Sequence, residues 1–137
     1  MGSVSNEKKV GRLTLDQLIA ARDQKERDKL RVEEIEIPSI GGTLLFKRPS
    51  DELILEMVNR LKDSGEDTKR YYDELANIIY ECCDDLKSQE LYDRLEVGNP
   101  IDVVYEIMDL NDIAVVGDKV CSMNSIFDGV EDQIKNA

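Results

Sequence analysis

The sequence predicts a mainly α-helical (α+β) domain of about four to five helices with one N-terminal β-hairpin. Apolar residues recur at intervals of three and four over several long stretches, which is the period of an amphipathic helix. Between residues 32 and 47 the period changes to two, which indicates strands. Glycine, proline and capping residues separate these stretches, and a chain of 137 residues suffices for one such domain.

Residues 1–31 predict a charged N-terminal helix or flexible arm. Thr14 and Gln17 form a capping box, so a helix should run over residues 15–31. The second half, RDQKERDKLR, mixes charges of both signs, which is typical of a solvated helix or of a partly disordered arm, and we favour the arm. The first half carries a short apolar patch made of Leu15, Leu18 and Ile19.

Residues 32–128 predict a single globular domain that begins with a β-hairpin. The alternation in VEEIEI and TLLFK puts the apolar side chains of each strand on one face: Ile35, Ile37, Leu44 and Phe46. Between the strands lies PSIGG, and we expect Gly41 or Gly42 to adopt a positive φ there. An isolated hairpin is marginally stable in water, so its apolar face must pack on helices.

The helices of the domain follow the hairpin. Ser50 can cap a helix after Pro49, and residues 53–61 have helical spacing. The next helix should span about residues 67–86, which is the strongest helical pattern in the chain. A short helix, SQELYDRLE, comes next, and another begins at Pro100. The last helix should run over about residues 112–127 or on toward 134, with Gly117 as a weak point and residues 129–137 as a C-terminal tail.

Two adjacent cysteines, Cys82 and Cys83, fall on the apolar stripe of the predicted 67–86 helix, among acidic neighbours. Adjacent helical residues point about 100° apart, so the pair cannot jointly hold one ion from a regular helix. Zinc takes four close ligands, and the chain has no histidine and only one further cysteine, Cys121. The pattern favours core packing over a metal or redox centre.

Catalytic and cofactor motifs are also missing from the sequence. The lack of histidine removes the commonest general base and the Ser-His and Cys-His nucleophile pairs. The Gly41–Gly42 pair lies in a hairpin turn and opens no helix, so it is no phosphate-binding loop. Asp109, Asn111 and Asp112 lack the spacing of a calcium loop. We therefore predict a non-enzymatic binding protein with no catalytic, cofactor-binding or metal residues.

The net charge of −12 is unevenly distributed. Residues 1–34 are near neutral, whereas residues 35–137 carry ten basic and twenty-three acidic side chains. Such a body repels phosphate backbones and anionic lipids, which excludes nucleic acid and membranes as partners. The sequence lacks an apolar run long enough for a signal peptide or a membrane span, so we expect a cytoplasmic protein.

The order of elements over residues 33–128 resembles a known family. An extended P-S-x-G segment at residues 38–41 precedes K-x-P-S at 47–50, and a D-L-K-x-x-E-L run follows at 85–91. This order is similar to that of the tail assembly chaperones of long-tailed phages and defective prophages, in particular the XkdN-like family. The positions that carry the match are Asp85, Leu86, Lys87, Glu90, Leu91, Tyr92, Pro100 and Val104.

The resemblance implies a role in viral morphogenesis without chemistry. Such chaperones bind the tape measure protein, assist tail tube assembly in the bacterial cytoplasm and are absent from the mature virion. It thus implies the tape measure protein as partner, with the tail tube protein as a further partner. A homo-oligomer is a separate possibility, since the sequence does not determine the oligomeric state. The alternative from composition is an acidic regulatory or anti-host protein-binding module of phage or prophage origin.

Two short apolar stripes are the candidate partner-binding residues. One lies near the C-terminus and consists of Ile126, Phe127, Val130 and Ile134. Its residues either pack on the core or form an amphipathic segment that lies in a groove of another helix. The other is the N-terminal patch of Leu15, Leu18 and Ile19.

Overall fold

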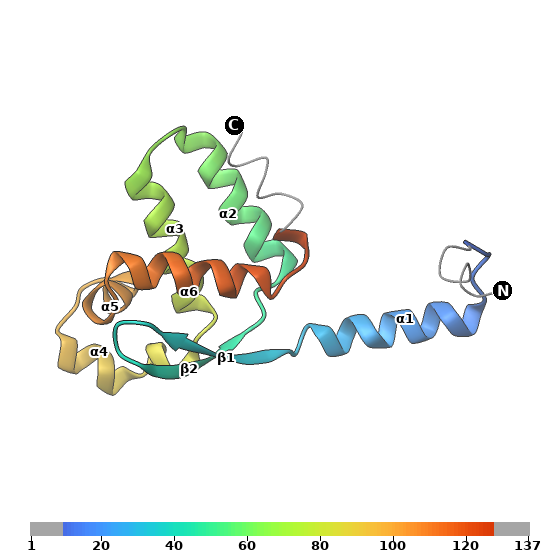
Figure 1. Cartoon of the computed structure of the whole chain (residues 1–137), viewed down its shortest axis with the longest axis horizontal. Coiled ribbons are helices and arrows are strands. Elements are labelled where there is room, and N and C mark those ends of the chain that lie inside the picture. The colour runs from blue at the N-terminus through green and yellow to red at the C-terminus, as the bar shows by residue number, and fades with distance from the viewer. Residues whose placement is uncertain (1–9, 128–137) are drawn as a thin grey trace.

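A two-stranded sheet lies between one N-terminal helix and five further α-helices in the computed structural model, which describes residues 10–127 (Figure 1). The elements before the helical body are α1 (Leu15–Asp28), β1 (Val32–Ile37) and β2 (Gly42–Lys47). Those of the body are α2 (Asp51–Ser64), α3 (Thr68–Glu81), the short 3₁₀ helix η2 (Asp84–Lys87), α4 (Gln89–Leu95), α5 (Pro100–Ile107) and α6 (Leu110–Ser122). This confirms the predicted mainly helical α+β class with one hairpin near the N-terminus.

The hairpin pairs its strands antiparallel, with Ile35 opposite Leu44. Its inner face is apolar as predicted: Ile35, Ile37 and Phe46 are buried and Leu44 is partly buried. This face packs against α6 through β1, which supplies the helical partner that an isolated hairpin needs. The turn closes with hydrogen bonds from the N–H groups of Ile40 and Gly41 to the carbonyl of Ile37.

Gly41 has a φ of +80°, which is strained for any side chain with a Cβ atom. We expect Gly41→Val to lower the free energy of unfolding by about 1–2 kcal/mol. Gly42→Val is the matched control, because Gly42 has no positive φ and a Cβ there would meet no atom within 4 Å. Urea denaturation followed by circular dichroism would measure both. Equal stabilities of the two variants would show that the turn imposes no strain.

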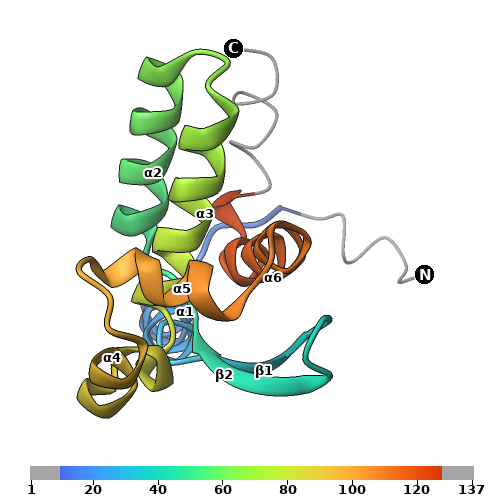
Figure 2. The ribbon, with the colours of Figure 1, turned by 90° about the vertical axis from the view of Figure 1, so that its left-hand side faces the viewer.

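Helix α3 is central to the helical body and packs against α2, α5 and α6 (Figure 2). Leu75, Ile78 and Ile79 are buried on it, and Asp67 caps its first turn by accepting a hydrogen bond from the N–H of Arg70. Capping boxes or single caps also begin α1, α2, α4 and α6. The helix starts therefore follow from local side-chain chemistry that the sequence displays.

The prediction that α3 continues to Leu86 is wrong, because the helix ends at Glu81. The carbonyl of Cys82 instead accepts a hydrogen bond from the N–H of Lys47 at 2.8 Å, which ties the helix end to β2. Leu86 is buried as the pattern predicted, but it belongs to the 3₁₀ helix η2 and not to α3. The apolar residues between 78 and 86 all reach the core, although the chain leaves the helix at Glu81 and turns back toward the core. Periodicity alone cannot distinguish this arrangement from a longer helix.

The last helix is also shorter than predicted, since α6 spans Leu110–Ser122 and not residues 112–127. Beyond it, the buried side chain of Asn124 donates hydrogen bonds to the carbonyl of Pro49 and to the carboxylate of Asp51. Its own oxygen accepts from the N–H of Ile126. These contacts join the end of the described chain to the start of α2. A turn at residues 123–125 ends α6, and residues 126–127 are helical again.

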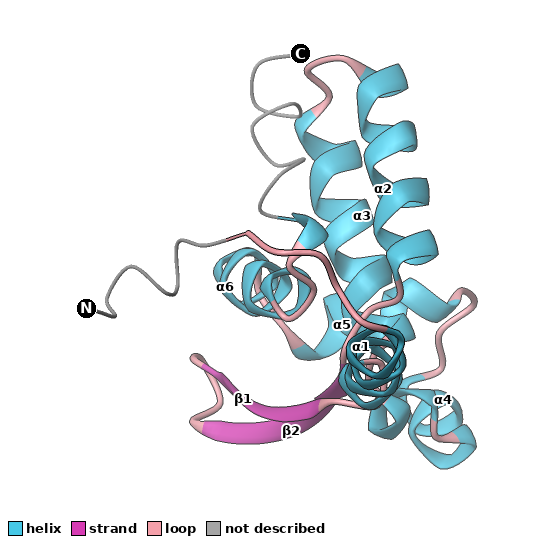
Figure 3. Ribbon diagram, turned by 90° about the vertical axis from the view of Figure 1, so that its right-hand side faces the viewer, coloured by secondary structure: helices cyan, strands magenta, loops and turns pink. Residues whose placement is uncertain are grey.

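Helix α1 projects from the body, and none of its residues is buried (Figures 1 and 3). It ends at Asp28, three residues earlier than predicted. Residues 15–28 form a solvent-exposed helix, which is one of the two alternatives for this segment. Its capping box joins Thr14 and Gln17, and side-chain pairs along the helix, such as Lys29–Glu26, add local support.

Candidate functional site

Helix α1 presents the N-terminal apolar patch to solvent. The exposed fractions of Leu15, Leu18 and Ile19 are 73%, 51% and 44%. Their spacing of three and four places them on one face of the helix. A helix of 14 residues is marginally stable in water by itself, so a partner that covers this face would stabilise it. The structure brings these three predicted residues together on one accessible stripe, which we call the α1 stripe.

The C-terminal candidates are placed differently. Phe127 is only 4% exposed and belongs to the hydrophobic core, and Ile126 is partly buried against it. Phe127 therefore stabilises the fold and has no side-chain surface to offer a partner. Val130 and Ile134, like the rest of the predicted tail at 129–137, lie outside the described residues.

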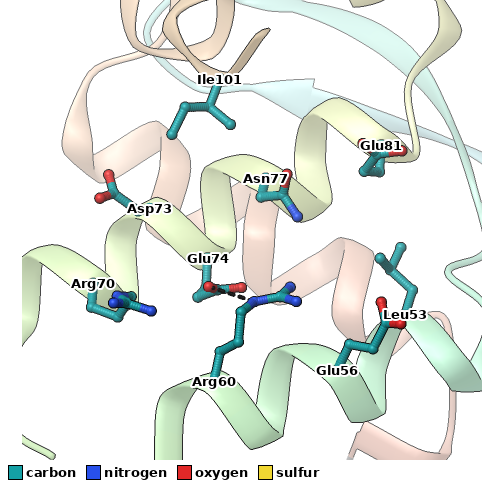
Figure 4. Close-up of a pocket in the computed structure, with 9 residues that line it drawn as sticks. All are labelled: Leu53, Glu56, Arg60, Arg70, Asp73, Glu74, Asn77, Glu81 and Ile101. Carbon is teal, nitrogen blue, oxygen red and sulfur yellow. Dashed lines mark hydrogen bonds and ion pairs between the residues drawn. The ribbon is translucent and has the colours of Figure 1, made fainter. Parts of the chain in front are cut away.

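A polar groove of about 730 Å³ runs along the outer faces of α2 and α3 and ends at α5 (Figure 4). Its acidic end carries Glu56 and Glu81, with Leu53 between them, and its other end reaches Asp73 and Ile101. No feature of the sequence indicated this groove. Its lining comes from three helices that are separate in sequence, and no local motif brings them together.

An ion pair between Arg60 and Glu74 crosses the centre of the groove (Figure 4). The Nε of Arg60 donates a hydrogen bond to Oε2 of Glu74 at 2.8 Å, which raises the pKa of the guanidinium. Glu74 is buried, and its other oxygen, Oε1, has no hydrogen-bond partner among the described residues. A buried, unpaired carboxylate lowers the stability of the folded state, so the charge of Arg60 is needed to compensate that of Glu74.

An apolar hollow of about 520 Å³ adjoins this groove between α3 and α5 and shares Asp73 and Ile101 with it. Tyr72, Tyr105 and Leu110 line it further. The hydroxyl of Tyr105 donates a hydrogen bond to Asp73, and burial together with this bond raises the pKa of the tyrosine. The two hollows meet at Asp73 and Ile101, and we call them together the α3 groove. One end of it is acidic. The other end is mainly apolar, with the charged residues Lys69, Arg70 and Asp102 also among its lining.

The cysteine pair is buried, as predicted. Cys82 and Cys83 are 3% and 0% exposed. Burial raises the pKa of Cys82 to about 12 and also raises the pKa of Cys83. A thiol that stays protonated at neutral pH is a poor nucleophile. Within residues 10–127, no group of three or more His, Cys, Asp or Glu side chains is arranged to hold a metal ion.

Replacing Cys82 with alanine should lower the free energy of unfolding by about 1 kcal/mol, because it truncates a small buried hydrophobe. The native protein should also react slowly with Ellman's reagent and release its full thiol content only in denaturant. Denaturation curves and thiol titration would test both. A thiol that reacts rapidly in the native protein at neutral pH would contradict burial of the pair.

The fold and these surfaces define a mainly helical α+β domain with an exposed, largely polar helix that carries a short apolar stripe, and with a groove whose two ends differ in polarity. Comparison of the chain with protein-family models, curated proteins and solved structures found no match. None of the helices in residues 10–127 combines the length and apolarity needed to cross a membrane.

Proposed function

We propose that this protein is a non-enzymatic tail assembly chaperone that binds the phage tape measure protein and assists tail tube assembly. The observation that carries the proposal is the α1 stripe, an apolar face on a helix without a single buried residue. The resemblance of residues 33–128 to the tail assembly chaperones adds the class of client. In this role the protein acts in the bacterial cytoplasm and is left out of the mature virion.

The mechanism is the temporary covering of client surface. A long helical client has apolar stripes that aggregate before they are packed, and the α1 stripe can lie along one of them as a second amphipathic helix. Binding also stabilises the α1 helix, because the α1 stripe and the apolar stripe of the client shield each other from water. The acidic body, with twenty-three acidic and ten basic residues over 35–137, keeps the complex soluble through like-charge repulsion.

The test is co-expression with a phage tape measure protein, which is the client that the proposal names. The variant combines Leu18→Gln with Ile19→Gln, which keeps good helix formers in α1. Soluble client should fall about ten-fold relative to wild type. The melting temperature should be unchanged, because both side chains are largely exposed at 51% and 44%.

The matched control replaces two exposed apolar residues of the hairpin, Ile40→Gln with Leu45→Gln, whose exposed fractions are 58% and 52%. This variant should solubilise the client like wild type. A wild-type protein that leaves the client insoluble would refute the proposed function. Equal losses in both variants would refute the role of the α1 stripe.

A further inference from the structure

Helix α1 cannot reach the α3 groove of its own chain. Only residues 29–31 separate it from β1, and the N–H of Arg48 donates a hydrogen bond to the carbonyl of Arg31 at 2.9 Å. An ion pair between Arg31 and Glu33 holds the same link. Figure 1 shows the result: α1 projects from the side of the body opposite α4 and α5. Within residues 10–127, the α3 groove of the same chain therefore cannot cover the α1 stripe, whereas the α3 groove of a second molecule can.

The polarity of α1 changes along its length. The apolar residues lie in its first half, and from Leu18 the same spacing of four and three continues through Arg22 and Lys25 to Lys29. Residues 22–31 carry five basic and three acidic side chains, in a chain whose net charge is −12. The helix is thus apolar at its N-terminal end and basic at its C-terminal end.

The α3 groove has the complementary polarity. Its apolar end is lined by Tyr72, Ile101 and Tyr105. Its acidic end carries Glu56 and Glu81 (Figure 4), and Glu81 also forms a 3.7 Å ion pair with Lys87. At the centre the Arg60–Glu74 pair is already neutralised. A helix that is apolar at one end and basic at the other therefore matches it in both halves.

We propose that α1 of one chain docks in the α3 groove of a second copy. The stripe residues would cover the apolar end, and Arg22, Lys25 and Lys29 would face the acidic end. The sequence itself provides this occupant, because no residue of α1 is buried and the helix has both an apolar patch and a net basic second half. Arg22 and Lys29 form exposed ion pairs with Asp23 and Glu26, which solvent screens, so the contact with the groove would have to replace or share them. The α1 stripe is also the client-binding surface of the proposed function, so a client and a second copy compete for it. Because self-association requires no client, it can be measured independently of the proposed chaperone function.

The experiment is sedimentation velocity of the full chain over a concentration series, with charge reversals on each side. One variant carries Arg22→Glu and Lys25→Glu in α1, and the other carries Glu56→Lys and Glu81→Lys in the groove. Wild type should self-associate, and each variant alone should do so at least ten-fold more weakly. An equimolar mixture of the two variants should recover heterologous association, because the reversed charges again oppose each other.

The matched control is Glu36→Lys with Glu106→Lys, which changes net charge as the groove variant does, at exposed positions outside the groove. It should associate at least as strongly as wild type. A wild-type chain that stays monomeric at all concentrations would overturn the inference. Association that the α1 and groove reversals leave unchanged, or a mixture that fails to restore it, would also overturn it, since the contact would then use other surfaces.

Discussion

Replacing Asp112 with alanine is expected to lower the free energy of unfolding by about 2–3 kcal/mol. The carboxylate is fully buried at the start of α6. It accepts hydrogen bonds from the N–H of Ser39 at 3.0 Å, from the Ser39 hydroxyl and from the N–H of Asp109 at 3.1 Å. The variant leaves these donors without their charged acceptor and releases the hairpin turn from α6. Urea denaturation would measure the loss.

Asp109→Ala is the matched control for this prediction. Asp109 caps the same helix by accepting a hydrogen bond from the N–H of Asp112 at 2.8 Å, whereas the hydrogen bonds with Ser39 of the hairpin turn belong to Asp112. Its loss should cost about 1 kcal/mol, which is typical of an N-cap. If both variants lost the same stability, the bonds between Asp112 and Ser39 would contribute nothing to the fold.

Acid should destabilise the protein in the same region. Burial alone would raise the pKa of Asp112, but the hydrogen bonds from Ser39 and Asp109 outweigh burial and the pKa is lowered. The side-chain hydrogen bond from Asn124 likewise lowers the pKa of Asp51. A lowered pKa in the folded state gives stability that is complete above the unfolded value of about 3.9 and is lost as the pH falls through the folded value.

Melting temperatures measured between neutral pH and about pH 2 should therefore fall below about pH 4. The decline should be smaller in Asp112→Ala, because that variant has already lost one of the carboxylates concerned. A wild-type melting temperature that is constant through this range would contradict the pKa direction assigned to Asp112 and Asp51.

Replacing Gly117 with valine should cost about 3 kcal/mol, because α6 crosses α3 at this glycine. A Cβ atom at Gly117 would lie 3.0 Å from Cβ, 3.1 Å from Cδ2 and 3.3 Å from Cγ of Leu75. The Leu75 Cβ is fixed to the α3 backbone, so the helices themselves must separate. Thermal denaturation would show the effect as a large drop in melting temperature.

Two further glycine variants separate this packing from backbone effects. Gly98→Val should change stability little, because a Cβ at Gly98 meets no atom within 4 Å and Gly98 has no positive φ. Gly117→Ala should fall between wild type and Gly117→Val, since better helix propensity offsets part of the crowding. A Gly117→Val protein as stable as wild type would show that α3 and α6 are not in close contact there.

Local chemistry determined much of the fold directly from the sequence. The Thr14–Gln17 capping box and the Ser50 cap set where α1 and α2 begin. The alternation of VEEIEI set the buried face of β1, and the turn glycine with a positive φ is Gly41, one of the two expected. These features depend on residues within a few positions of each other, so they can be predicted from the sequence alone.

The candidate site was determined only in part. The sequence displayed the apolar patch on α1, because three apolar residues at helical spacing are visible locally. It did not show that Phe127 is core or that Glu56, Glu81 and Ile101 line one groove. Those facts depend on which helices become neighbours, and no short-range pattern encodes that.

By itself, the sequence determined the class of fold, the hairpin with its buried face and the apolar burial of Cys82. Only the tertiary structure showed where α3 and α6 end and which hydrogen bonds the buried polar side chains form. Asp112 appeared in the sequence as part of an incomplete calcium pattern, and Gly117 as a weak point in a helix. In the structure Asp112 joins the hairpin turn to α6, and Gly117 permits close approach of α3. The partners of both residues, Ser39 and Leu75, are distant in sequence, and only packing brings them into contact.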